Sequence, residues 1–88
     1  MNLSSTPTIL FEDGNAIFIN KPAGISVHSD GKTPEYTVAD WVLEKYPALR
    51  EVGEPLVIRH KGEEILVPKP GIVHRLDKET SGVMLIAK

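Results

Sequence analysis

The chain has 88 residues, enough for one small domain, and its hydrophobic content of 41% and charged content of 25% are ordinary for a globular protein. It contains no cysteine, which excludes disulfides and thiolate metal sites and fits a reducing compartment. No apolar run approaches the roughly 18 residues of a membrane span, and no basic-then-apolar leader is present. We therefore expect a cytoplasmic protein with no membrane partner.

The formal net charge of −2 argues weakly against a dedicated nucleic-acid binder, because phosphate neutralisation supplies much of the affinity of such proteins. The acidic residues concentrate in the first two thirds of the chain, and a mild basic excess lies between Arg59 and Lys78. Charge by itself does not establish an RNA partner.

The N-terminal part of the chain predicts a β-hairpin. Residues 1–7 are polar and typical of a disordered start. Thr8–Glu12 is a short β-prone run, and Asp13–Asn15 supplies a turn that contains a glycine free to adopt positive φ. Ala16–Asn20 carries consecutive large apolar side chains, which indicates a mostly buried second strand.

A helix is predicted to begin after Thr37. Thr37 is a good N-cap, and Asp40 completes a capping-box-like pair that also suits the helix dipole. The apolar residues that recur on one helical face are Val38, Trp41, Val42 and Tyr46. Pro47 ends the helix. Tryptophan can stack on bases, but the helical spacing of Trp41 favours a place in the core.

The segment after the helix predicts a second hairpin. Ala48–Pro55 is interpreted as a linker, and Leu56–Ile58 as a short strand that pairs with Ile65–Val67 through a turn at Lys61–Glu64. This hairpin is expected to be surface-exposed. Val83–Ala87, a short apolar run after a glycine, predicts a buried last strand.

The stretch from His74 to Gly82 carries the most chemistry. It places one carboxylate, Asp77, among three potential cations: His74, Arg75 and Lys78. Nearby opposite charges favour the ionised form of a carboxylate. In one interpretation Asp77 is a turn residue salt-bridged to Arg75 or Lys78. In the other, Asp77 is a nucleophile or general base and Arg75 contacts an anionic substrate. The residues alone leave both open.

A second stretch, residues 20–28, forms the loop after the first hairpin. Pro22 biases Lys21 toward extended geometry, and Gly24 allows close approach to another backbone. The pattern alone is typical of a turning loop with a solvated lysine. His28 is interpreted as a partner for a backbone or side-chain group rather than as a catalytic acid.

Both stretches resemble motifs of the RluA-type pseudouridine synthases. Residues 74–82, HRLDKETSG, followed by an apolar run and Ala-Lys, are similar to the family's His-Arg-Leu-Asp-x-x-Thr-Ser-Gly signature. Residues 20–28, NKPAGISVH, are similar to its upstream Asn-Lys-Pro-x-Gly-x-x-Val-His motif. The motifs stand in the family's order with a helix-like segment between them, and the resemblance covers Ile9 to Lys88.

The resemblance implies an RNA pseudouridine synthase, an isomerase acting on uridine in ribosomal or transfer RNA after base flipping. It implies that Asp77 is the catalytic carboxylate and that Arg75 contacts the RNA where the flipped base left the stack. His74 and Lys21 complete the expected RNA-binding residues, with Lys21 in a loop beside the aspartate. Attack on ribose, attack on uracil and proton abstraction all remain open for the aspartate. The reaction needs no cofactor and no metal.

The expected fold is α+β, an antiparallel or mixed β-sheet with hairpins and one packed helix. Residues 1–88 are expected to form the N-terminal portion of a pseudouridine synthase catalytic domain, without a separate N-terminal RNA-binding domain, because the family's domain is considerably longer. The alternative is a truncated, noncatalytic RNA-binding or strand-pairing fragment. Such a fragment would self-associate through the open edge of the strand Val83–Ala87.

Overall fold

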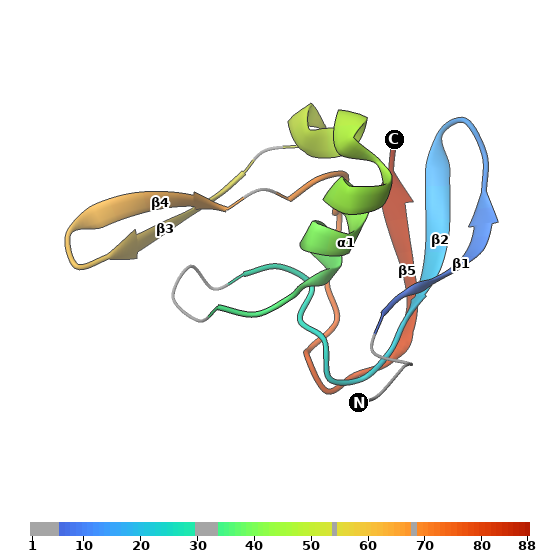
Figure 1. Cartoon of the computed structure of the whole chain (residues 1–88), viewed down its shortest axis with the longest axis horizontal. Coiled ribbons are helices and arrows are strands. Elements are labelled where there is room, and N and C mark those ends of the chain that lie inside the picture. The colour runs from blue at the N-terminus through green and yellow to red at the C-terminus, as the bar shows by residue number, and fades with distance from the viewer. Residues whose placement is uncertain (1–5, 30–33, 54, 68) are drawn as a thin grey trace.

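The computed structural model of the chain describes residues 6–29, 34–53, 55–67 and 69–88. In chain order its elements are β1 (Thr8–Glu12), β2 (Ala16–Lys21), α1 (Val38–Lys45), the 3₁₀ helix η1 (Pro47–Glu51), β3 (Leu56–His60), β4 (Glu63–Val67) and β5 (Gly82–Ala87). Figure 1 shows β1, β2 and β5 side by side and the β3–β4 hairpin projecting away from them. The predicted α+β class with antiparallel hairpins and one packed α-helix is confirmed.

The main sheet has three strands in the order β1-β2-β5, and both pairings are antiparallel. The turn between β1 and β2 is closed by Asp13, whose Oδ1 accepts the backbone N–H groups of Asn15 at 2.8 Å and Ala16 at 2.9 Å. Gly14 does not adopt positive φ, contrary to the expectation for this turn. The two hydrogen bonds to the Asp13 carboxylate stabilise this turn without a left-handed glycine.

One face of this sheet is buried against α1. Alternate residues of a strand point to the same face, so Ile17 and Ile19 of β2 and Met84 and Ile86 of β5 all lie in the core with no exposed surface. The helix contributes its predicted apolar face: Val38, Trp41 and Val42. Trp41 is a core residue, as its spacing indicated. This packing fixes β5, and with it the loop that precedes β5.

Both ends of α1 follow the sequence signals, since the helix ends at Lys45, just before Pro47, but the segment after it differs from the prediction. Thr37 and Asp40 form the predicted capping box. Ala48–Pro55 is not all linker, because Pro47 opens η1 and Leu49 is buried against the core. Proline is favoured in the first turn of a helix, and burial of an apolar side chain stabilises the short turn that follows.

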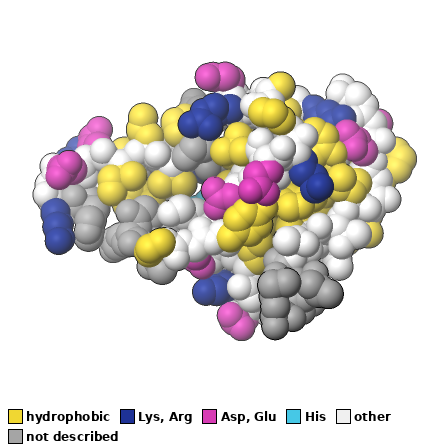
Figure 2. Space-filling model, in the orientation of Figure 1, with side chains coloured by type: hydrophobic (Ala, Val, Ile, Leu, Met, Phe, Trp, Pro, Cys, Tyr) yellow, Lys and Arg dark blue, Asp and Glu magenta, His cyan; other side chains and the backbone are white. Residues whose placement is uncertain are grey.

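The second hairpin is longer than predicted and its turn is tighter. Only Lys61 and Gly62 form the turn, both with positive φ of 53° and 78°, so Glu63 belongs to β4. Positive φ at both central residues is the geometry that suits the twist of a two-residue hairpin. Figure 2 shows hydrophobic side chains along this projecting hairpin, where Val57 is 52% and Leu66 63% exposed. Its predicted surface exposure is confirmed.

Two further sequence expectations concern the N-terminal segment and the absence of a membrane span. Of the N-terminal segment expected to be disordered, residues 1–5 lie outside the described residues, whereas Pro7 is buried. Within the described residues, no helix is long and apolar enough to cross a membrane.

Candidate active site

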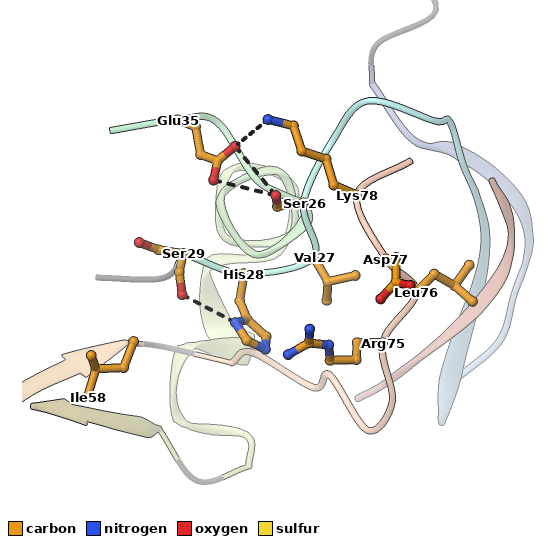
Figure 3. A pocket seen from close by; sticks show the side chains of 10 residues that line it. All are labelled: Ser26, Val27, His28, Ser29, Glu35, Ile58, Arg75, Leu76, Asp77 and Lys78. Atoms are coloured by element: carbon orange, nitrogen blue, oxygen red, sulfur yellow. Dashed lines mark hydrogen bonds and ion pairs between the residues drawn. The ribbon is translucent and has the colours of Figure 1, made fainter. Parts of the chain in front are cut away.

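A cavity of about 370 Å³ opens between the loop that follows β2 and the loop that precedes β5. This is within the range of roughly 300–1,000 Å³ that is usual for ligand pockets. Figure 3 shows the residues that line it: Ser26, Val27, His28, Ser29, Glu35, Ile58, Arg75, Leu76, Asp77 and Lys78. The cavity thus brings together the two motifs that the sequence singled out, and β3 of the projecting hairpin adds Ile58.

Asp77 and Arg75 lie on one wall of this cavity, both exposed. Figure 3 shows the Arg75 guanidinium reaching toward His28 on the facing wall. Among the described residues, none forms a hydrogen bond or ion pair with the side chain of Asp77 or of Arg75. The predicted salt bridge from Asp77 to Arg75 or Lys78 is therefore absent among the described residues, whereas the Asp77 carbonyl does accept the Thr80 N–H in a turn at 2.9 Å. An anionic and a cationic group stand at the cavity, each available to a substrate.

Lys78 is held away from its neighbour Asp77 by a carboxylate that the sequence did not single out. Its Nζ lies 3.3 Å from Oε1 of Glu35, and the Ser26 hydroxyl donates to both oxygens of the same carboxylate at 3.4 Å. This pair joins the loop before β5 to the segment that leads into α1. Glu35 gave no sequence signal, because an isolated glutamate in a polar loop is typical of a solvated residue.

Lys21 is completely buried, with none of its surface exposed. Its ammonium donates to three backbone carbonyls: Pro22 at 3.0 Å, Lys78 at 3.1 Å and Thr80 at 2.7 Å. An ammonium has three hydrogens to donate, so none is left for a phosphate. The expectation that Lys21 contacts RNA is not supported by this geometry, which makes Lys21 an internal support of the loop formed by residues 74–81, called the signature loop below.

Two opposing influences act on the ionisation of the Lys21 ammonium in this position. Burial lowers the pKa of Lys21, and the negative charges of Glu79 and Asp77 oppose that shift. The neighbouring Gly24 N–H donates to the Lys78 carbonyl at 2.7 Å. The predicted packing of the 20–28 loop beside the aspartate is confirmed, and its physical basis is a set of carbonyls facing one buried cation.

His74 does not line the cavity but lies beside β5, where the segment before the signature loop turns away from that strand. Its Nε2 accepts the backbone N–H of Leu85 at 3.0 Å. On the facing wall, His28 Nδ1 lies 3.3 Å from the Ser29 carbonyl, which agrees with its interpretation as a hydrogen-bond partner. Among the described residues, no three histidine, aspartate or glutamate side chains are grouped as metal ligands.

Comparison with known proteins gives one consistent result. The family model described as RNA pseudouridylate synthase matches residues 15–88. The chain is 44% identical to an uncharacterized RNA pseudouridine synthase of Synechocystis. It is 41% and 39% identical to the ribosomal large subunit pseudouridine synthases D of Xylella fastidiosa and Escherichia coli. Each match covers 91% of this chain and 20 or 21% of the relative, so the chain spans about a fifth of their length.

Proposed function

The chain belongs to the RNA pseudouridylate synthase family, and from this membership we propose that it supplies the catalytic aspartate for isomerising uridine to pseudouridine in RNA. The observation that carries the proposal is the Asp77 carboxylate, exposed at a cavity and unpaired with any described residue. An aspartate in a turn often caps backbone N–H groups with its side chain, and no described residue donates to the side chain of Asp77. That side chain is presented to whatever enters the cavity.

The proposed chemistry uses the two side chains of the cavity wall in different ways. Attack on ribose, attack on the uracil ring and proton abstraction all need an ionised carboxylate within reach of the nucleoside. Asp77 supplies that group. Arg75, five donors on a planar fork, binds the phosphate backbone or fills the space that the flipped uridine vacates. His28 faces Arg75 and bounds the cavity.

We propose ribosomal RNA as the substrate, since the similar proteins of Xylella fastidiosa and Escherichia coli are named as ribosomal large subunit enzymes. Transfer RNA is the alternative that the assay must include. We also propose that the protein acts in the cytoplasm, which its lack of cysteine fits. Fractionation of cells that express the tagged chain would test that location.

A noncatalytic strand-pairing fragment has weaker support. Pairing needs free backbone groups along a strand edge, and two N–H groups of the outer β5 edge already have partners: Ala87 donates to Gly71 and Leu85 to His74. If self-association nevertheless occurs, sedimentation would show an oligomer whose fraction rises with protein concentration.

Tritium release tests the proposal directly. The chain is incubated with ribosomal and transfer RNA tritiated at the uracil carbon that becomes glycosidic, and released tritium is counted. We expect release from ribosomal RNA, none from Asp77→Asn, and wild-type release from the control Glu63→Gln at the remote hairpin turn. Release that persists in Asp77→Asn refutes the role of Asp77. No release from either RNA with the wild type refutes activity of the chain.

A further inference from the structure

The backbone N–H groups on the outer edge of β5 donate to two kinds of acceptor, first a backbone carbonyl and then a side chain. In a strand, N–H groups two residues apart point to the same edge. Ala87 N–H donates to the Gly71 carbonyl at 2.8 Å, beside the bridge between Ile72 and Ile86. Two residues earlier along that edge, Leu85 N–H donates to His74 Nε2 at 3.0 Å. The imidazole continues the ladder that the backbone at residues 71–72 begins.

This change takes place where the chain turns toward the cavity. Val73, between the backbone contact and the imidazole contact, is 61% exposed, so most of its surface faces solvent. The next residues, Arg75 to Asp77, line the cavity. His74 is thus the last contact with the sheet edge before the residues of the cavity wall. His74 therefore contacts β5 at the point where the signature loop turns away from that strand.

The hydrogen bond also fixes the state of the ring. An amide N–H can only donate, so Nε2 must carry no hydrogen, and the neutral ring holds its hydrogen on Nδ1. A doubly protonated imidazolium has no acceptor and cannot make this contact. The bond to Leu85 is therefore incompatible with His74 acting as a cation toward phosphate.

We propose that His74 is a positioning residue, which holds the signature loop to the β5 edge through Leu85 and so places Arg75 and Asp77, rather than a residue that contacts RNA. What the loop accomplishes rests on the proposed function, whereas the contact itself does not.

Three substitutions of His74 distinguish a role of its hydrogen-bond acceptor from a role of its ring. The Oε1 of glutamine extends about as far from the backbone as Nε2 of histidine, so His74→Gln retains an acceptor for Leu85 N–H. The Oδ1 of asparagine extends only as far as Nδ1, and leucine has no acceptor, so His74→Asn and His74→Leu lose the bond. Glutamine carries no charge and no ring, so it rescues only a role that depends on the acceptor.

The first readout is hydrogen exchange of the Leu85 amide in the 88-residue chain, with the backbone NMR shifts of residues 75–78. We expect wild type and His74→Gln to protect Leu85 alike, and His74→Asn and His74→Leu to exchange about five- to tenfold faster, as for loss of one hydrogen bond. The shifts of residues 75–78 should move in the same two variants only. Equal protection in all four proteins, or unmoved shifts, overturns the proposal.

The second readout is tritium release, with the RNA dissociation constant measured separately. Positioning predicts that kcat falls at least about tenfold in His74→Asn and His74→Leu and is retained in His74→Gln, at unchanged RNA affinity. Weaker RNA binding in all three variants, or a His74→Gln protein that protects Leu85 yet loses turnover, overturns it. If the wild type releases no tritium, the proposed function fails, and exchange and shifts alone decide the role of His74.

Discussion

Lys21→Met tests the buried cation under the signature loop. Methionine retains most of the apolar length of lysine, so the buried stem of Lys21 stays filled while the ammonium is removed. The Lys78 carbonyl still accepts the Gly24 N–H, but the carbonyls of Pro22 and Thr80 lose their donor. The substitution therefore changes hydrogen bonds and charge while it retains the packing.

The size of the effect follows from those two carbonyls. A polar group that loses its partner costs about 1–2 kcal/mol here, in the range for buried groups, which sums to about 2–4 kcal/mol for two carbonyls. Removing a buried charge offsets part of this, since burial disfavours the ammonium and lowers the pKa of Lys21. We expect a net loss of about 2 kcal/mol in the free energy of unfolding, or about 8–16 °C in Tm for a domain of this size.

Thermal and denaturant unfolding followed by circular dichroism measure this loss, and Lys61→Met at the exposed hairpin turn is the matched control. The control should stay within about 0.5 kcal/mol of the wild type, as exposed substitutions do. Lys21→Met should also lower kcat for tritium release, because two of the three carbonyls belong to the signature loop. A Lys21→Met protein as stable and as active as Lys61→Met would refute the reasoning.

The same substitution predicts a change in pH dependence. The pKa of Lys21 is lowered from 10.5 in the folded chain, so between the two values the unfolded chain binds more protons. Stability that depends on this group therefore rises with pH as the pH approaches 10.5 from below. Lys21→Met should lack that rise, and an unchanged slope of stability against pH in this window would contradict the assignment.

Three further substitutions test other supports of the site. Gly71→Ala should destabilise the protein by about 2–4 kcal/mol in denaturant unfolding, as for strained and overpacked sites. The added Cβ would overlap the carbonyl oxygen of Ala87, the last residue of β5, at a φ of +68°. A neutral effect would contradict this contact. Asp13→Ala should destabilise the first hairpin and remove an acid-dependent loss of stability. Two backbone hydrogen bonds lower the pKa of Asp13, so the stability they give is present above the unfolded pKa of 3.8 and is lost as the pH falls. An unchanged acid-unfolding midpoint would contradict this prediction. Glu35→Gln should change the free energy of unfolding by at most about 0.5 kcal/mol, because the pair of Glu35 with Lys78 is partly exposed. The same substitution should reduce the rate of tritium release. Equal rates in Glu35→Gln and the control Glu44→Gln would show that the pair does not support the loop.

Sequence reasoning succeeded where the determining groups lie within a few residues of one another. The Thr37–Asp40 capping box placed the start of α1, and the apolar spacing placed Trp41 in the core. The first hairpin has the predicted β1 bounds, because turn residues and apolar runs both stand in one short segment. The signature also placed Asp77 on the loop before the last strand, and β5 follows it directly.

It failed where the partner is far away in the chain. Lys21 read as solvated because its carbonyl partners in the signature loop lie 57 and 59 residues further on. Glu35 had no signal because its cation becomes its neighbour only after folding. Leu49 lay in an expected linker, and its burial depends on the core assembled by β2, α1 and β5. Each feature that was missed depends on a tertiary contact, made by a residue whose local sequence is typical of a solvated loop or a linker.

These distant contacts hold the loop without any hydrogen bond or ion pair from a described residue to the side chains of Asp77 and Arg75. The signature loop is held through its backbone by the Lys21 ammonium, through the side chain of Lys78 by Glu35, and at its start by the bond from Leu85 to His74. None of these hydrogen bonds and ion pairs uses the carboxylate of Asp77, whose charge acts on the Lys21 ammonium only through space. Catalysis gains when a charged group is fixed in place without being neutralised, because little reorganisation is then needed when the substrate arrives. A loop anchored by its carbonyls and flanking side chains meets both conditions, which a loop anchored through Asp77 itself would not.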